Sequence, residues 1–482
     1  MKMQPPTIRC RPLVTGAAVF QPSAGNVSPA RARSGSVLII VMWIALGLVA
    51  IALYFANSMT YELRASDNRV AGLAADQAIE GAARYVTYIL SLYATNGAVP
   101  LATNQFLCAD VPAGDAHFWL IGRDPNADDS VMSSGEPCFG LVDEGSKLNL
   151  NTVNTNVLSY LPGMTTDFAN AILDWRSTNG VVALDYASLG YYPKNAPFET
   201  EDELRLVYGA TEDLLVGGDL NRNGVLDANE TTAGAGDVNF GLFEYTTVWT
   251  REPNFQTNGA ALTNINQLVL NSPNPATLTT FLQNEGVGNA ASVAQSLYAS
   301  IRSAAGVNPV TGLVDLAHRC WQAGMSESDF GKIYDDVTTS TNSYLVGRVN
   351  VNTAGLTVLT ALFEGMDIDQ QTALGAAQTL IAYRQQNPNN LNTVWWLMDA
   401  LGNNHPVITA LTRRDWVTTR SYQFIADIAA VGPYGRGYRR VKFIFDTSNG
   451  SPIIIYRQDL SRLGWALGDQ VRQTLLANNT TP

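Results

Sequence analysis

A stretch of twelve residues near the middle of the chain carries oxygen-bearing side chains at a characteristic spacing. It runs from residue 219 to residue 230 and reads DLNRNGVLDANE. Side-chain oxygens fall at the first, third, fifth, ninth and twelfth places, glycine takes the sixth, and valine at the seventh offers a backbone carbonyl. Calcium binds hard oxygen ligands, and this is the spacing of the twelve-residue EF-hand loop. The sequence therefore predicts a calcium site whose ligands are Asp219, Asn221, Asn223, Val225, Asp227 and Glu230. The alternative interpretation is a turn rich in Asn, Asp and Gly that holds no ion.

Residue patterns typical of catalysis do not occur in the sequence. The three histidines, His117, His318 and His405, lack metal-ligand spacing, and there is no Gly-x-Ser-x-Gly or phosphate-loop motif. The carboxylate pairs Asp143-Glu144 and Glu201-Asp202 are expected to be solvated or to cap helices, because nothing pairs them as an acid and a base. We therefore predict that the protein is not an enzyme.

A long helix is expected near the N-terminus, well before the calcium loop. Residues 37–55 contain no charge and no proline, and at 1.5 Å per residue they span about 28 Å, the thickness of a bilayer's hydrocarbon core. Apolar residues then recur every three or four positions, with no proline before Pro100. The sequence predicts one helix over 36–95, whose first third lies in a membrane and whose remainder packs on a globular head.

The 35 residues before this helix contain five basic residues and no acidic one, which favours the cytoplasmic side. Their removal changes the net charge from −12 to −17, and so acidic a body disfavours nonspecific nucleic-acid binding. A secretory signal peptide would end in a cleavage site followed by unrelated sequence, whereas the helical pattern here continues. An ordinary single-span anchor remains the alternative.

Strand patterns lie near both ends of the globular part, and helical patterns fill the middle. The expected strands are at 117–124 and 138–147, then at 421–432, 439–447 and 452–460. We expect the α+β fold class, with a long helix packed on a small antiparallel sheet and a large, mostly helical domain inserted in it. Two tandem domains are the alternative, but each sheet would then have few strands.

The four cysteines are expected to differ in environment. Cys10 lies in the leader, and Cys320 is expected to be a buried thiol. Cys108 and Cys138 flank a short segment outside the membrane, where a disulfide between them could form.

The helical domain contains an internal repeat, with copies at about 147–209 and 348–402. Each copy has an Asn-x-Asn-Thr start, an apolar helix, a turn at Gly163 or Gly365 and a second helix. We expect the Asn-Thr pairs to cap the first helices and both glycines to adopt the left-handed conformation. The copies look like helix-hairpin-helix units.

Such hairpins often bind nucleic-acid backbones through amides at the glycine turn. The second turn, residues 364–367, reads EGMD and is acidic where a phosphate would lie. We therefore interpret the hairpins as packing and protein-contact units, and nucleic-acid binding is not expected.

These features together resemble the K-class minor pseudopilins of type II secretion systems. The basic leader, Gly35 and the apolar helix resemble the class III leader of type IV pilins and pseudopilins. The fifth residue after that glycine, usually glutamate in the wider family, is Ile40, and its lack is characteristic of the K class. The phrases DEGSKLNLNT, LPGM, AILDWR and FETEDEL are similar to the family's usual run, and the similarity extends from residue 33 to about 467.

The resemblance implies a structural function at the tip of the secretion pseudopilus. A prepilin peptidase would cut between Gly35 and Ser36, and the new terminus would be methylated. The partners would be the I- and J-class minor pseudopilins, the major pseudopilin and the inner-membrane assembly platform. The chain would cross the inner membrane once, with its head in the periplasm and calcium (Ca2+) in its inserted domain. The alternatives are a minor pilin of a type IV pilus and a membrane-anchored helix-hairpin-helix receptor for DNA uptake.

The expected organisation has six parts. They are a leader at 1–35, a helix at 36–95, head segments at 96–147 and 416–470, an inserted domain at 148–415 and a C-terminal tail at 471–482.

Overall fold

The computed structural model describes most of the chain after the leader. The described residues are 35–93, 97, 106–130, 132, 134–178, 186–228, 230, 239–256, 259–303 and 306–479. The leader through residue 34, including Cys10, lies outside them. The chain forms two units, residues 1–65 and 66–482.

The described part of the first unit is the beginning of helix α1 (Gly35–Tyr93). From residue 37 to residue 57 every side chain is exposed, and the run is strongly apolar. Among the described residues, α1 is the one helix long and apolar enough to cross a membrane, judged by length and composition. The expected membrane segment therefore coincides with a helix.

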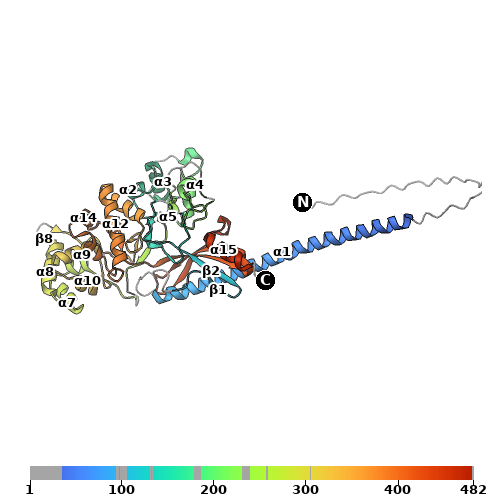
Figure 1. Cartoon of the computed structure of the whole chain (residues 1–482). Coiled ribbons are helices and arrows are strands. Elements are labelled where there is room, and N and C mark those ends of the chain that lie inside the picture. Colours follow the sequence, from blue (N-terminus) through green and yellow to red (C-terminus); the bar gives the residue numbers. More distant parts are fainter. Residues whose placement is uncertain are drawn as a thin grey trace, which may run out of the picture. The chain divides into compact units, whose positions relative to one another are not determined.

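In the second unit, the rest of α1 packs on an antiparallel sheet (Figure 1). Its buried face recurs every three or four residues and is rich in alanine, which lets backbones approach closely: Ala75, Ala78, Ile79, Ala82, Val86 and Leu90. Gly432 lies directly against the backbone of Ala71, where a Cβ atom would overlap. The apolar periodicity of this stretch thus has its physical cause in one buried helix face.

The sheet joins strands from both ends of the globular part. Its order is β1 (Val111–Ala113), β2 (Ala116–Ile121), β14 (Gln423–Gly432), β15 (Arg436–Asp446) and β16 (Ile453–Asp459), and β3 (Val142–Asp143) also pairs with β14. All these pairings are antiparallel. The predicted fold class is confirmed: a long helix, a small antiparallel sheet and a large insertion between its strands.

The two faces of the sheet have different characters because side chains alternate along a strand. One face carries Phe424, Ile428 and Phe443 and packs against α1. The opposite face carries Asp427, which lies beside Lys442 on the neighbouring strand. These charged residues are nevertheless buried, since the inserted domain covers this face.

The sequence prediction was wrong at one place in the head. Residues 138–147 contain the two-residue strand β3 and the 3₁₀ helix η1 (Glu144–Ser146), because the Asp143 carboxylate accepts a hydrogen bond from Gly145 N and bends the chain. Much of the segment expected as a C-terminal tail lies in helix α15 (Gly468–Asn479), and the preceding Leu467 belongs to the same buried cluster as Trp119.

The inserted domain contains the internal repeat as two similar sets of elements. The first set is β4 (Leu148–Asn149), α2 (Thr155–Ser159), α3 (Thr166–Arg176), η3 (Glu201–Leu206) and β5 (Thr246–Thr247). The second set is β12 (Val349–Asn350), α11 (Leu356–Glu364), α12 (Gln370–Gln386), α13 (Trp396–Leu401) and β13 (Val417–Thr418). In each set the first and last strands pair in parallel. The two sets contact each other through α2 and α11.

Each copy is held together internally by an equivalent arginine. Arg176 donates to the carbonyl oxygens of Leu150 and Val153. Arg384 donates in the same way to the carbonyls of residues 351 and 354, at 3.0 and 2.9 Å. Burial lowers the pKa of each arginine to about 10. The repeat therefore extends from sequence to individual hydrogen bonds.

The expected helix caps were wrong. Helix α2 is capped by Asn154, whose side chain accepts a hydrogen bond from Val157 N. The equivalent residue in α11 is Gly355, and the missing cap comes from Asp129 in the loop after β2, whose carboxylate accepts from Thr357 N at 2.8 Å. The two copies share the same residue spacing, but the free amides at the starts of their first helices are capped in two different ways.

The expected turn geometry holds in one copy. Gly163 is left-handed, with φ of 70°. Gly365 instead has a right-handed helical conformation, and Asp367 adopts the positive φ of 65°. Gly365 is required for a different reason, since a Cβ atom there would overlap Val157 of the other copy.

A third group of helices connects the two copies. The chain enters it through β6 (Arg251–Pro253) and leaves through β11 (Tyr344–Val346), which pair with each other. Between them lie α6 (Ile265–Leu270), α7 (Ala276–Asn284), α8 (Ala290–Ile301), α9 (Leu313–Gln322) and α10 (Glu327–Ile333). Figure 1 shows these helices gathered together. Two further strand pairs, β7 (Thr263–Asn264) with β10 (Val337–Thr338) and β8 (Arg302–Ser303) with β9 (Gly306–Val307), close this group.

Candidate functional site

The predicted calcium loop is folded by its own acidic side chains. Asp219 accepts backbone hydrogen bonds from Asn223 at 2.9 Å and from Gly224 at 2.7 Å. Gly224 has φ of 86°, which a residue with a side chain adopts only with strain. The first ligand position therefore curls the following five residues around itself.

The end of the loop closes on its beginning. The two carboxylate oxygens of Glu230 accept hydrogen bonds from Asn221 N at 3.0 Å and from Asp227 N at 3.1 Å. Asp227 in turn accepts from the side-chain amides of Asn221 at 2.5 Å and Asn223 at 3.1 Å. All five predicted side-chain ligands are thus gathered by the loop itself.

The residues present fit a cation. Burial raises the pKa of Asp219 and of Glu230, and neighbouring carboxylates of the loop raise the pKa of Glu230 further, so a positive charge there would relieve an electrostatic cost. The side-chain oxygen of Asn221 is buried and accepts no hydrogen bond from the described residues. Among those residues no group of three or more His, Cys, Asp or Glu side chains is placed to hold a metal. A calcium ion here would therefore depend on amide and backbone oxygens as well as on carboxylates.

The loop is not part of a full helix–loop–helix hand. The helix before it, α4 (Glu212–Leu215), and the next described helix, α5 (Leu242–Tyr245), are each about one turn long. Leu226, expected to point inward, packs against the core of the inserted domain. The loop is positioned mainly by the head.

Groups from the head sheet hold the loop backbone. Arg440 of β15 donates to the carbonyl oxygens of Asn221 and Arg222. Arg123, which follows β2, donates to the Arg222 carbonyl at 3.2 Å. The Asn221 amide donates to the carbonyl oxygen of Trp465 at 3.0 Å. The loop is therefore held by head residues from both sides of the insertion: Arg123 before it, and Arg440 and Trp465 after it.

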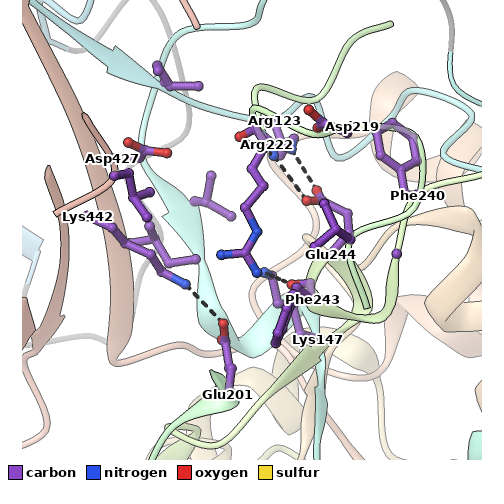
Figure 2. Close-up of a pocket in the computed structure, with 16 residues that line it drawn as sticks. Arg123, Lys147, Glu201, Asp219, Arg222, Phe240, Phe243, Glu244, Asp427 and Lys442 are labelled. Atoms are coloured by element: carbon purple, nitrogen blue, oxygen red, sulfur yellow. Dashed lines mark hydrogen bonds and ion pairs between the residues drawn. The ribbon is translucent and has the colours of Figure 1, made fainter. Parts of the chain in front are cut away.

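A small charged cavity of about 60 Å³ adjoins the loop (Figure 2). Two ion pairs cross it: Lys442 contacts Glu201 at 3.1 Å, and Arg123 contacts Glu244 at 2.6 Å. Burial alone would raise the pKa of Glu244, but Arg123 and nearby cations outweigh it and lower that pKa to about 2. A cavity this small holds a few water molecules rather than a substrate.

The carboxylates expected to be solvated or capping are mostly buried. Asp143 does cap a short helix, yet it is buried and also accepts a hydrogen bond from Asn350 of the second repeat. Glu144 is fully buried, and burial together with Glu201 raises its pKa. Glu201 belongs to the first repeat and Lys442 to the head, so their ion pair joins the two. The prediction of solvated carboxylates was wrong because the residues that pack around these carboxylates lie far away in the sequence.

Sequence reasoning missed Asp427, Arg440 and Lys442 as parts of this junction. The sequence does contain a signal for this junction, since Arg440 and Lys442 occur two residues apart in a predicted strand and so share a face. Charged residues inside a strand that is otherwise apolar indicate a buried polar partner.

Cys108 and Cys138 both lie against strand β2. Their carbonyl oxygens accept hydrogen bonds from Leu120 N and Gly122 N, each at 2.8 Å. Burial raises the pKa of Cys138, and Asp124 and the nearby Cys108 raise it further. The predicted disulfide between them stays a prediction. Cys320 is a buried thiol, as expected, and burial raises its pKa to about 12.

The second hairpin turn is enclosed. The amides of Gly365 and Met366 donate to Ala361 and Phe363 carbonyls, and Gly365 lies against Val157. A nucleic-acid phosphate has no access to these amides, so the geometry of this turn favours the protein-packing interpretation.

Comparisons with known proteins agree with the predicted family. Residues 349–411, which are the second repeat up to α14 (Pro406–Leu411), match the family model for protein K of the type II secretion system. The prediction of a K-class minor pseudopilin is thereby confirmed. None of the curated proteins compared matches the chain.

Among solved structures, a chain of the GspK–GspI–GspJ complex from the type 2 secretion system of enterotoxigenic Escherichia coli is similar to this chain. The identity is 11%, the TM-score is 0.36, and the match covers 80% of this chain and 97% of that chain.

Proposed function

We propose that this chain is a non-enzymatic subunit at the tip of the type II secretion pseudopilus. The observation that carries the proposal is the match of the second repeat to protein K of that system. The same repeat is built into the head through hydrogen bonds from Asn350 to Asp143 and from Thr357 to Asp129, so it is an integral part of the fold. A structural subunit of the secretion filament needs such a rigid head on a membrane helix.

The apolar start of α1 supports membrane insertion before assembly. In the proposed pathway the leader stays in the cytoplasm, the helix crosses the inner membrane once, and the head lies in the periplasm. A prepilin peptidase cuts between Gly35 and Ser36, and the new terminus is methylated. The helix then leaves the membrane as the filament grows.

The partners in this proposal are the I- and J-class minor pseudopilins. They are the proteins named with GspK in the solved complex. The exposed groups of α1 within the second unit offer a contact face, since Val70, Leu73, Tyr88 and Leu92 are spaced along one side of the helix and remain exposed. The major pseudopilin and the inner-membrane assembly platform complete the set. Calcium in the loop at 219–230 holds the inserted domain in place on the head.

The test is co-purification and secretion in the organism that encodes the chain. The full chain, coexpressed with the I- and J-class minor pseudopilins of its own system, is expected to purify with them in detergent. Deletion of its gene is expected to stop type II secretion and leave surface pili unchanged. Normal secretion combined with loss of pili would instead indicate the type IV pilus alternative. Loss of DNA uptake alone would indicate the receptor.

A further inference from the structure

Arg440 has a position that charged residues rarely adopt. It lies within β15, and its side chain is 0% exposed. Burying a guanidinium costs several kcal/mol unless its charge and its donors are satisfied. The groups that pair with its charge and accept from its donors therefore explain why Arg440 is stable in the sheet.

Half of its partners are in the head. Arg440 Nε donates to Asp427 Oδ1 at 2.8 Å, and one terminal nitrogen donates to Asp427 Oδ2 at 2.5 Å. This bidentate pair between neighbouring strands neutralises the charge. It leaves donors that point away from β14.

The other half of its partners belong to the calcium loop. The remaining donors reach the carbonyl oxygens of Asn221 and Arg222, the latter at 2.8 Å. Asn221 is the third position of the loop, and its backbone N–H is held by Glu230, the twelfth. Arg222 has φ of 57°, an unusual value for a residue with a side chain. One peptide segment thus links the guanidinium to two expected ligands.

We propose that Arg440 is a positioning residue through which cation occupancy of the 219–230 loop and the seating of the inserted domain on the head sheet become one coupled equilibrium. This inference rests on the proposed calcium site. A cation that fixes Asn221 and Glu230 also fixes the two carbonyls that Arg440 needs. Conversely, a seated sheet presents Arg440 and so holds the loop in its ligating shape. Such coupling acts equally in both directions.

The structure offers a matched control for this idea. Arg348 is also a buried arginine, and it pairs with Glu252 and Asp415 beside the strand pair β6–β11. Its loss should destabilise the inserted domain about as much as the loss of Arg440. It should not alter the loop, because Arg348 pairs with Glu252 and Asp415, which lie outside the loop.

The experiment is calcium titration of the full chain in detergent by calorimetry, for wild type and for Arg440→Met and Arg348→Met. We expect Arg440→Met to raise the calcium dissociation constant about tenfold or more, which is within the usual range of a coupling between sites. We expect Arg348→Met to change it less than about twofold. Arg440→Lys, which keeps a charge beside Asp427 but lacks the fork, should recover part of the affinity.

Hydrogen exchange measures the reverse direction. Calcium is expected to slow amide exchange around β15 and residues 461–467 in wild type but not in Arg440→Met. Should Arg440→Met fail to fold, Asp427→Asn replaces it, since that variant loosens the guanidinium without removing it, and a smaller loss of affinity is expected.

The outcomes separate the inference from the site on which it rests. A wild-type chain that binds no calcium overturns both. A wild-type chain that binds calcium, with Arg440→Met binding equally well, overturns only the coupling. Equal losses in Arg440→Met and Arg348→Met also overturn it, because the effect would then be general destabilisation.

Discussion

At the scale of single residues, the chain places charged groups in its interior and pairs several of them with oppositely charged groups from other elements. Asp427 and Arg440 pair across two strands, and Glu201 pairs with Lys442 between the first repeat and the head. The ligand residues of the loop could be read from sequence because they are contiguous. Their anchors could not, because nothing local relates residue 440 to residue 221.

The loop gives the first prediction. Replacing Asp219 and Glu230 together by alanine should lower the melting temperature in calcium, since two expected ligands and four backbone hydrogen bonds are lost. Thermal unfolding in calcium and in chelator measures this. In wild type the two melting temperatures should differ, and in the double variant the difference should vanish. Equal wild-type values under both conditions would remove the calcium site.

Glu244 gives a prediction about pH. Its folded-state pKa is lowered to about 2 from 4.5, so it stabilises the fold at pH values above its unfolded pKa, and this contribution disappears as the pH falls toward 2. The shift corresponds to about 3 kcal/mol. Urea unfolding of Glu244→Gln between pH 2 and pH 7 should therefore show a deficit near neutrality that closes on acidification. A deficit independent of pH would mean that packing, not charge, is responsible.

At the scale of elements, the two repeats show how one sequence pattern can be satisfied in two ways. The helices, the meander β14–β16 and the repeat boundaries follow from periodicity and turn residues, which are local signals. The cap of α11 was misassigned because Asp129, which supplies it, lies more than two hundred residues earlier. The left-handed turn was misassigned because Gly365 serves the contact with Val157.

The cap of α11 is a second testable element. Asp129→Ala should destabilise the chain by about 1 kcal/mol, the usual cost of a lost helix cap. Asp128→Ala is the control, since that exposed side chain bonds locally to Ser130. Denaturant unfolding compares the two. An equal effect of both substitutions would show that the loop, rather than the cap, carries the stability.

At the scale of the whole molecule, one chain combines a long apolar helix segment with a globular unit, and their surfaces suit different solvents. The resemblance that predicted the K class depended on features spread over the entire sequence, and the family model confirms it from one repeat. The processing site follows from the same resemblance. Coexpression with a prepilin peptidase should give a mature chain that begins at Ser36, whereas Gly35→Ala should remain uncut. Intact mass and N-terminal sequencing measure both, and cleavage after Phe55 would return the plain anchor to consideration.

The pairing of β2 with β14 has a consequence for how the chain is made. Residues 122–422 lie between these neighbouring strands, so β14 is synthesised only after all of them. Domains generally fold as their sequence becomes complete, from the N-terminus onward. Until the final strands arrive, the alanine-rich face of α1 has too little sheet to cover it. A chain cut short by interrupted translation would keep that face exposed and so be more open to proteolysis than a chain that contains β14 to β16.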